Sequence, residues 1–183
     1  MKIAVMGTGG VGGYFGGLIA RSGEDVTFIA RGAHLDAIER NGLRVVSDLS
    51  GEFVLDAKAA SDPVEVGPVD LVLYTVKMYH NDDAIPFIAP MVGPETVVMP
   101  LLNGIDNHTQ LVSVFGKERV MIGVAFVQAR IREPGVIEQL GKFGRIVFGE
   151  IDRCISKRAQ KMLDVFKNAA WNVELTDNAL GAL

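Results

Sequence analysis

Six residues near the start of the chain have the types and spacing of a phosphate-binding loop. They fit the pattern G-x-G-x-x-G, between a predicted strand over residues 2–6 and a predicted helix over residues 11–22. In this pattern the first glycine makes a tight turn, the second admits a pyrophosphate, and the third lets helix and strand pack closely. The predicted cofactor-binding residues of the loop are Gly7, Thr8, Gly9, Gly10, Val11 and Gly12. A glycine turn that serves only the fold is the alternative.

A basic residue follows the second predicted strand, where many dinucleotide-binding domains carry an acid. This strand covers residues 25–30 and Arg31 comes directly after it. An acid at that place binds the 2′-hydroxyl of NAD, whereas a guanidinium can hold the 2′-phosphate of NADP by paired charged hydrogen bonds. Arg31 therefore favours NADP over NAD. A solvated arginine at a strand end is the alternative.

Two further polar side chains follow apolar runs. Lys77 comes after residues 71–76, and Asn103 comes after residues 97–102. Open α/β sheets bind their ligands at the carboxyl ends of parallel strands, so both residues are candidates for a catalytic cleft. The Asn103 amide could anchor either a ribose of the cofactor or a substrate oxygen. An ordinary surface lysine and a plain Asn103-Gly104 turn are the alternatives.

The other reactive residue types form no recognisable site. His80 and His108 have no partner that the sequence can assign, and we interpret both as surface residues. The only cysteine, Cys154, has no second thiol and no histidine cluster beside it, so the sequence predicts no metal site.

Short apolar runs alternate with longer amphipathic stretches, which is typical of βαβ units. Residues 43–47 and 52–57 suggest a hairpin, and residues 120–131, 135–140 and 145–148 suggest antiparallel strands with turns at 134–135 and 141–144. We predict an α/β fold of Rossmann type, with a doubly wound, mostly parallel sheet of five or six strands and an antiparallel edge. The predicted domain covers residues 1–176, and residues 177–183 are expected to begin another helix.

Composition narrows the classes of partner. The formal charge is −4 and no long basic run is present, which argues against nucleic acid. The first apolar run has only four residues, too few for a signal peptide or a membrane span. Together with the single cysteine, these features predict a cytoplasmic protein.

The glycine loop, Arg31, the strand end at residues 75–77 and the Leu-Leu-Asn-Gly segment at residues 101–104 resemble the ketopantoate reductase family, the 2-dehydropantoate 2-reductases. The resemblance covers essentially the whole chain. It implies that the glycine loop and Arg31 bind NADPH, and that Lys77 and Asn103 face its nicotinamide end and the substrate. It also implies that the strand at residues 123–130 walls the cleft, with Ala129 as a backbone contact of the cofactor.

Family members continue into a helical C-terminal domain that supplies a catalytic lysine and a substrate-binding glutamate. The resemblance therefore implies that this chain is the cofactor-binding part of an enzyme that reduces 2-dehydropantoate to pantoate, as a homodimer when full length. We expect the chain alone to bind NADPH at micromolar or weaker affinity and to reduce no keto acid. A reductase of another 2-keto or 3-hydroxy acid, and a stand-alone NADP-binding or sensing module, are the alternatives.

Overall fold

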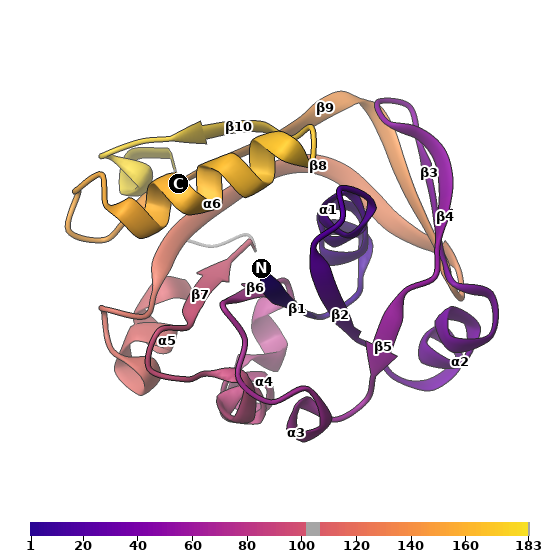
Figure 1. Cartoon of the computed structure of the whole chain (residues 1–183), viewed down its shortest axis with the longest axis horizontal. Coiled ribbons are helices and arrows are strands. Elements are labelled where there is room, and N and C mark those ends of the chain that lie inside the picture. The colour runs from indigo at the N-terminus through magenta and orange to yellow at the C-terminus, as the bar shows by residue number, and fades with distance from the viewer. Residues whose placement is uncertain (102–106, 183) are drawn as a thin grey trace.

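The computed structural model describes residues 1–101 and 107–182, which form two sheets with helices around and between them (Figure 1). The first sheet is parallel, with five strands in the order β5-β2-β1-β6-β7. Its strands are β1 (Lys2–Met6), β2 (Asp25–Ile29), β5 (Lys58–Ala60), β6 (Leu71–Tyr74) and β7 (Val97–Pro100). The predicted parallel sheet is confirmed.

Both faces of this sheet are covered, which explains why its strands are continuous apolar runs. The helices are α1 (Gly10–Arg21), α2 (Gly32–Asn41), α3 (Pro63–Val66), α4 (Asn81–Phe87), α5 (Asn107–Phe115) and α6 (Lys157–Asn168). Helix α1 lies on one side of the sheet, and α4 and α5 lie on the other (Figure 1). Because successive side chains of a strand point to opposite faces, Val5 joins the core on the α1 side and Met6 joins the core on the α4 side. The doubly wound arrangement is confirmed.

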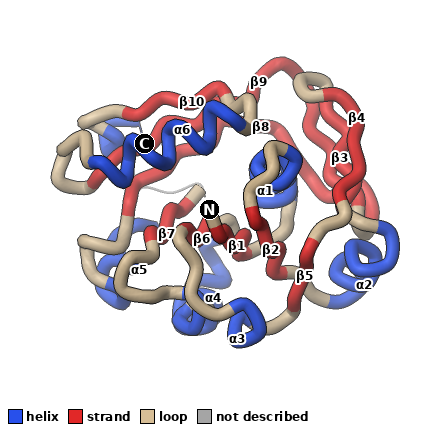
Figure 2. Tube along the Cα trace, in the orientation of Figure 1, coloured by secondary structure: helices blue, strands red, loops and turns tan. Residues whose placement is uncertain are grey.

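The second sheet is mixed and packs on the far side of α1. Its strands are β3 (Leu43–Ser47), β4 (Gly51–Leu55), β8 (Met121–Glu133), β9 (Val136–Glu150) and β10 (Asn172–Leu175). The pairs β3–β4 and β8–β9 are antiparallel, whereas β9 runs parallel to β3 and to β10. A single bridge between Val98 and Val120 links β7 to the start of β8. The predicted antiparallel strands therefore adjoin the parallel sheet at that bridge and then form a sheet of their own (Figure 2).

Glycines on α1 allow the two sheets to approach the helix from opposite sides. A Cβ atom at Gly16 would lie 2.6 Å from Val5 of the parallel sheet. On the other face, a Cβ atom at Gly13 would lie 2.5 Å from Ile137 of β9. Because close packing leaves no room for these added atoms, the glycines set the spacing between helix and sheets.

One predicted turn is wrong. Residues 141–144 do not end a strand, because β9 continues through them opposite β8 and the register shifts there. Gly141 has φ +74°, and residues 141–143 form a bulge between the paired residues Leu140 and Gly144. The buried Gln139 amide donates to the carbonyls of Leu140 and Gly141, both at 2.8 Å. These bonds satisfy backbone groups that leave the ladder, so the strand bulges and does not stop.

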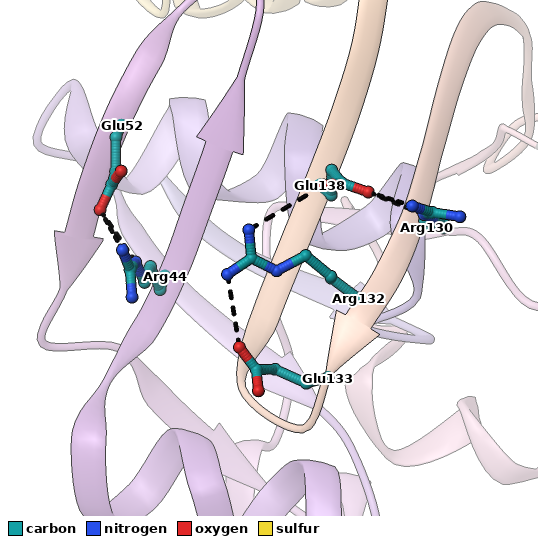
Figure 3. A network of polar contacts seen from close by, with 6 residues as sticks. All are labelled: Arg44, Glu52, Arg130, Arg132, Glu133 and Glu138. Carbon is teal, nitrogen blue, oxygen red and sulfur yellow. Dashed lines mark hydrogen bonds and ion pairs between the residues drawn. The ribbon is translucent and has the colours of Figure 1, made fainter.

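The outer face of the second sheet carries charged pairs (Figure 3). Arg44 on β3 donates to Glu52 on β4 at 2.5 Å and 2.9 Å. Arg130 and Arg132 on β8 both approach Glu138 on β9, at 2.6 Å and 3.9 Å. Such cross-strand pairs help to fix the register of a sheet whose other face is apolar.

The C-terminal part packs against the same core. Ser156 caps α6 by accepting the Ala159 N–H at 3.0 Å, and Trp171 stacks on Phe166 with ring centroids 4.3 Å apart. A short 3₁₀ helix, η3 (Ala179–Ala182), follows β10. The domain boundary at residue 176 and the longer helix beyond it stay predictions. Over the described ranges, none of the helices combines the length and the hydrophobicity that a membrane crossing requires.

Candidate functional site

The glycine loop joins β1 to α1 in a geometry that two of its glycines make possible. Gly7 has φ +94°, which favours glycine. The Thr75 hydroxyl lies within 3.0 Å of the Met6 carbonyl and 2.7 Å of the Gly7 carbonyl, and so ties the loop to the end of β6. A Cβ atom at Gly12 would lie 2.3 Å from Thr75 Oγ1 and 2.4 Å from the Gly7 carbonyl oxygen. The turn and the close helix–strand contact expected of the motif are therefore both present.

The middle of the loop is open to a ligand. A Cβ atom at Gly9 would meet no heavy atom within 4 Å, in contrast to Gly12. Gly9 caps α1, and its carbonyl accepts the Gly13 N–H at 2.7 Å. The N–H groups of residues 10–12 precede this first helical donor and so have no partner in the helix. Open space beside free N–H groups and a helix dipole fits the pyrophosphate of a dinucleotide.

Strand β8 lies against the loop from the other side. A Cβ atom at Gly10 would lie 2.2 Å from the carbonyl oxygen of Ala129 and 2.5 Å from the backbone nitrogen of Arg130. The backbone at Ala129 therefore borders the glycine loop, which is the position the family resemblance implied. Its contact with a cofactor stays a prediction.

A pocket of about 480 Å³ opens beside the loop, at the carboxyl ends of β1, β2 and β6. It is lined by Met6, Gly7, Ile29, Ala30, Arg31, Ser61, Val76, His80, Asp83, Ala84 and Phe87. Arg31 is exposed and caps α2 in an extended conformation. It takes part in none of the ion pairs found over residues 1–101 and 107–182, so its guanidinium is available to an anion at the pocket.

Of the two predicted catalytic residues, only Lys77 is among those that the structure describes. Lys77 is exposed just beyond β6, and its Nζ lies 5.9 Å from the centre of the Tyr79 ring. It does not line the pocket that contains Arg31. The Leu101 N–H donates to the Tyr74 carbonyl at 2.8 Å, so the chain leaves β7 beside the end of β6. Asn103 follows two residues later and lies outside the described residues.

The comparisons with known proteins agree with this geometry. The sequence model of the family described as Ketopantoate reductase PanE/ApbA matches residues 3–153, which include the glycine loop, Arg31, Lys77 and Ala129. The chain belongs to the ketopantoate reductase family. It is an oxidoreductase family, so the site at the strand ends is a candidate active site and not merely a nucleotide pocket.

Individual family members show the extent of the similarity. The chain is 34% identical over 181 residues to a 2-dehydropantoate 2-reductase from Pyrococcus horikoshii, which covers 99% of the chain and 58% of that protein. A solved 2-dehydropantoate 2-reductase from Geobacter metallireducens superposes with a TM-score of 0.91 at 39% identity, covering 97% of this chain and 58% of that one. A solved D-mandelate dehydrogenase with NADH and anilino(oxo)acetate gives a TM-score of 0.83 at 27% identity, over 98% and 58%. The chain thus spans less than two thirds of these relatives.

Three polar residues of the pocket escaped the sequence analysis. His80 is exposed, as expected of a surface residue, but it lines the pocket together with Asp83, one helical turn further along. Both lie in the segment that follows β6, and their access to the pocket depends on how α4 packs beside the strands. Ser61 follows β5, whose place beside β2 depends on a long-range pairing that no local pattern shows. His108, in contrast, is half-buried on α5 and does not line the pocket.

His34 on α2 is hydrogen-bonded to the β8–β9 turn, and its buried Nε2 has no partner among residues 1–101 and 107–182. Its Nδ1 accepts the Gly135 N–H at 3.0 Å, which leaves the proton on Nε2 in the neutral ring. Burial lowers the pKa of the His34 imidazole, and the Thr8 backbone carbonyl offsets part of this shift. His34 is therefore a positioning residue that works in its neutral form.

A buried chain of hydrogen bonds supports the segment that carries Lys77 and His80. The Tyr74 hydroxyl donates to Asn81 Oδ1 at 3.0 Å, and Asn81 Nδ2 donates to Gln110 Oε1 at 2.6 Å. Burial raises the pKa of Tyr74, so its hydroxyl stays protonated as a donor. These hydrogen bonds fix the positions of β6, α5 and the start of α4 relative to one another. They thereby hold the short helix η1 (Met78–His80) at the mouth of the pocket.

Proposed function

We propose that this chain is the NADPH-binding part of a 2-dehydropantoate 2-reductase, which reduces 2-dehydropantoate to pantoate. The observation that carries the proposal is a glycine loop that is open at Gly9 and borders, through Gly7, a pocket lined by the free guanidinium of Arg31. The names of the relatives from Pyrococcus horikoshii and Geobacter metallireducens support the choice of substrate. NADPH, when bound, supplies the hydride, while the protein binds and orients the reactants.

Each part of the site has a task in this proposal. The N–H groups that follow Gly9 bind the pyrophosphate, and the pocket takes the adenosine with its 2′-phosphate on Arg31. Lys77 and Asn103 then face the reacting end of the cofactor, where Lys77 attracts the carboxylate of the keto acid and Asn103 orients a polar oxygen. The backbone of β8 near Ala129 closes the cleft on its remaining side.

For this chain we expect NADPH binding without reduction of the keto acid. It spans 58% of its relatives, and the family resemblance places the proton-donating lysine beyond residue 183. We expect the chain to bind NADPH and to show no measurable oxidation of NADPH with 2-dehydropantoate. Appreciable turnover by the chain alone would mean that the described site already contains the proton donor.

The binding step is tested by titrating the chain with NADPH and NADH. Replacing Arg31 by alanine should weaken NADPH binding by about tenfold to a hundredfold and leave NADH binding nearly unchanged, because only the 2′-phosphate loses its partner. Arg40→Ala is the matched control, since Arg40 is an exposed arginine on the same helix that does not line the pocket. Equal losses for both cofactors, or no loss in Arg31→Ala, would overturn the assignment of Arg31.

A second candidate is the reduction of a different 2-keto acid with NADH. It is favoured by the similarity to D-mandelate dehydrogenase, which was solved with NADH. In that case the chain should bind NADH at least as tightly as NADPH. A preference for NADPH that disappears in Arg31→Ala would favour the first proposal.

A further inference from the structure

The adenosine pocket carries two opposite charges that come from different elements. Arg31 stands at the end of β2 and the start of α2, whereas Asp83 belongs to the first turn of α4. The walls between them are mostly apolar, with Met6, Ile29 and Phe87 among the residues that line the pocket. A ligand that fits this pocket has a flat apolar body, an anionic group for Arg31 and a hydrogen-bond donor for Asp83.

The Asp83 carboxylate has no other evident task. It forms no ion pair or hydrogen bond with the residues at 1–101 and 107–182, although it lines the pocket. Asp82 lies in the same first turn of α4 and can interact with the helix N-terminus equally well, but it does not line the pocket. The two adjacent aspartates thus differ in their access to the pocket.

Asp83 differs in chemistry from the other polar groups of the pocket. The hydroxyl of Ser61 can both donate and accept hydrogen bonds, and the imidazole of His80 is a donor as well, so neither requires an amino group on the base. An ionised carboxylate only accepts. It therefore favours a ligand that presents an amino group and disfavours one that presents a carbonyl oxygen at the same place.

We propose that Asp83 accepts a hydrogen bond from the exocyclic amino group of adenine and so makes the pocket selective for adenine dinucleotides. This inference rests on the proposed binding of NADPH. Hypoxanthine is the informative contrast, because it carries a carbonyl oxygen where adenine carries the amino group. That oxygen would face the carboxylate as a second acceptor, and the nearest donor of hypoxanthine, its N1–H, lies on the adjacent ring atom, out of line with the contact made by the amino group.

The experiment compares the affinities of the chain for NADPH and for deamino-NADPH, in which hypoxanthine replaces adenine. The unaltered chain should bind NADPH about tenfold more tightly or better, because the charged acceptor then faces a carbonyl oxygen where adenine presents an amino group. Asp83→Asn should remove most of this preference, since an amide can donate to the carbonyl oxygen as well as accept from the amino group. Asp82→Asn is the matched control and should keep the preference.

The experiment distinguishes a failure of the proposed NADPH binding from a failure of the role proposed for Asp83. If the unaltered chain binds neither nucleotide, the proposed function fails. If it binds both with equal affinity, or if Asp83→Asn keeps the full preference, the inference about Asp83 is overturned and the proposed function stands. A gain in NADPH affinity in Asp83→Asn without loss of base preference would show that the carboxylate only repels the 2′-phosphate, which also contradicts the inference. Should Asp83→Asn fail to fold, Asp83→Ala is measured in the same way with the same expected loss of preference.

Discussion

The glycine loop and the β8–β9 hairpin (residues 121–150) that lies against it are built in different ways. The loop takes much of its shape from residues close in sequence, with Gly7 and Gly12 as its fixed points. Its distant hydrogen bonds go to the neighbouring strand ends, from the Thr75 hydroxyl to the Gly7 carbonyl and from Thr8 to the Ile29 carbonyl. The hairpin is held by distant partners, such as β3 through backbone pairing and His34 through the Gly135 N–H. The two meet where Gly10 touches the backbone of Ala129. A local motif thus depends on a long-range structure for one wall of its ligand site.

The largest loss of stability is expected at the end of the β8–β9 hairpin, where Glu150 binds Arg158 of α6. The buried Glu150 carboxylate accepts two hydrogen bonds from Arg158, at 2.8 Å and 2.6 Å, and another from Ser156. Arg158→Met removes the charge that compensates this carboxylate, so the free energy of unfolding should fall by about 3 kcal/mol. Denaturant unfolding measures the change.

The exposed pair on the same sheet provides the control. Arg44→Met breaks the contact with Glu52, and both side chains of that pair are largely exposed. The expected loss is at most about 1 kcal/mol, because water and salt screen the attraction. Equal losses in the two variants would contradict the anchoring role given to Arg158.

The next largest loss of stability is expected at Gly12, where the glycine loop packs closely against β1. Gly12→Ala places a Cβ atom 2.4 Å from the backbone oxygen of Gly7, which cannot move without displacing β1. The free energy of unfolding should fall by about 1–3 kcal/mol, the usual cost of overpacking. The measurement is again denaturant unfolding, and unchanged stability would show that helix and strand do not need this close contact.

Gly9→Ala sharpens the contrast within the loop, because its added methyl group meets only open space. Stability should change by about 1 kcal/mol or less, since only the preference of the cap position is affected. NADPH affinity should nevertheless fall by about tenfold, because the methyl group occupies the space through which the pyrophosphate approaches. Normal binding of NADPH by the Gly9→Ala variant would place the pyrophosphate elsewhere.

The smallest effect is a pH dependence in the contact that His34 of α2 makes with the β8–β9 hairpin. Because burial lowers the pKa of His34 in the folded chain, the unfolded chain takes up the proton first as pH falls below its ordinary value of 6.5. The stability contributed by neutral His34 is complete above that value and is lost as pH falls toward the lowered pKa. His34→Asn keeps an acceptor for the Gly135 N–H without a titrating ring, so it should have a flatter stability profile between about pH 7 and pH 5. Parallel profiles for the two proteins would contradict this role.

The same contrast explains what the sequence could predict. The glycine loop, the parallel strands and the place of Arg31 and Lys77 at strand ends follow from local patterns, and the structure confirms these positions. The continuation of β9 through residues 141–144 depends on Gln139, whose side chain satisfies the bulge only after the sheet has formed. No local pattern contains that information.

Only part of the candidate site was predictable from the sequence, namely the residues at the ends of β1 and β2. Residues that follow β1 and β2 were identified because the motif itself places them at these strand ends, where the pocket opens beside Gly7 and Arg31. Asp83 and Ser61 line the same pocket because α4 and β5 are packed beside those strands, and such packing is not visible in a single sequence. His80 was correctly expected to be exposed, yet its access to the pocket could be seen only in three dimensions.

The central claim is that the described site binds the adenosine 2′-phosphate and the pyrophosphate of NADPH without help from the nicotinamide end. The most direct measurement is a calorimetric titration of the chain with 2′-phospho-ADP-ribose and with ADP-ribose, which both lack nicotinamide. We predict that the phosphorylated compound binds within a fewfold of NADPH and that ADP-ribose binds about tenfold more weakly or worse. Equal affinities for the two compounds, or no binding of either while NADPH binds, would contradict the account.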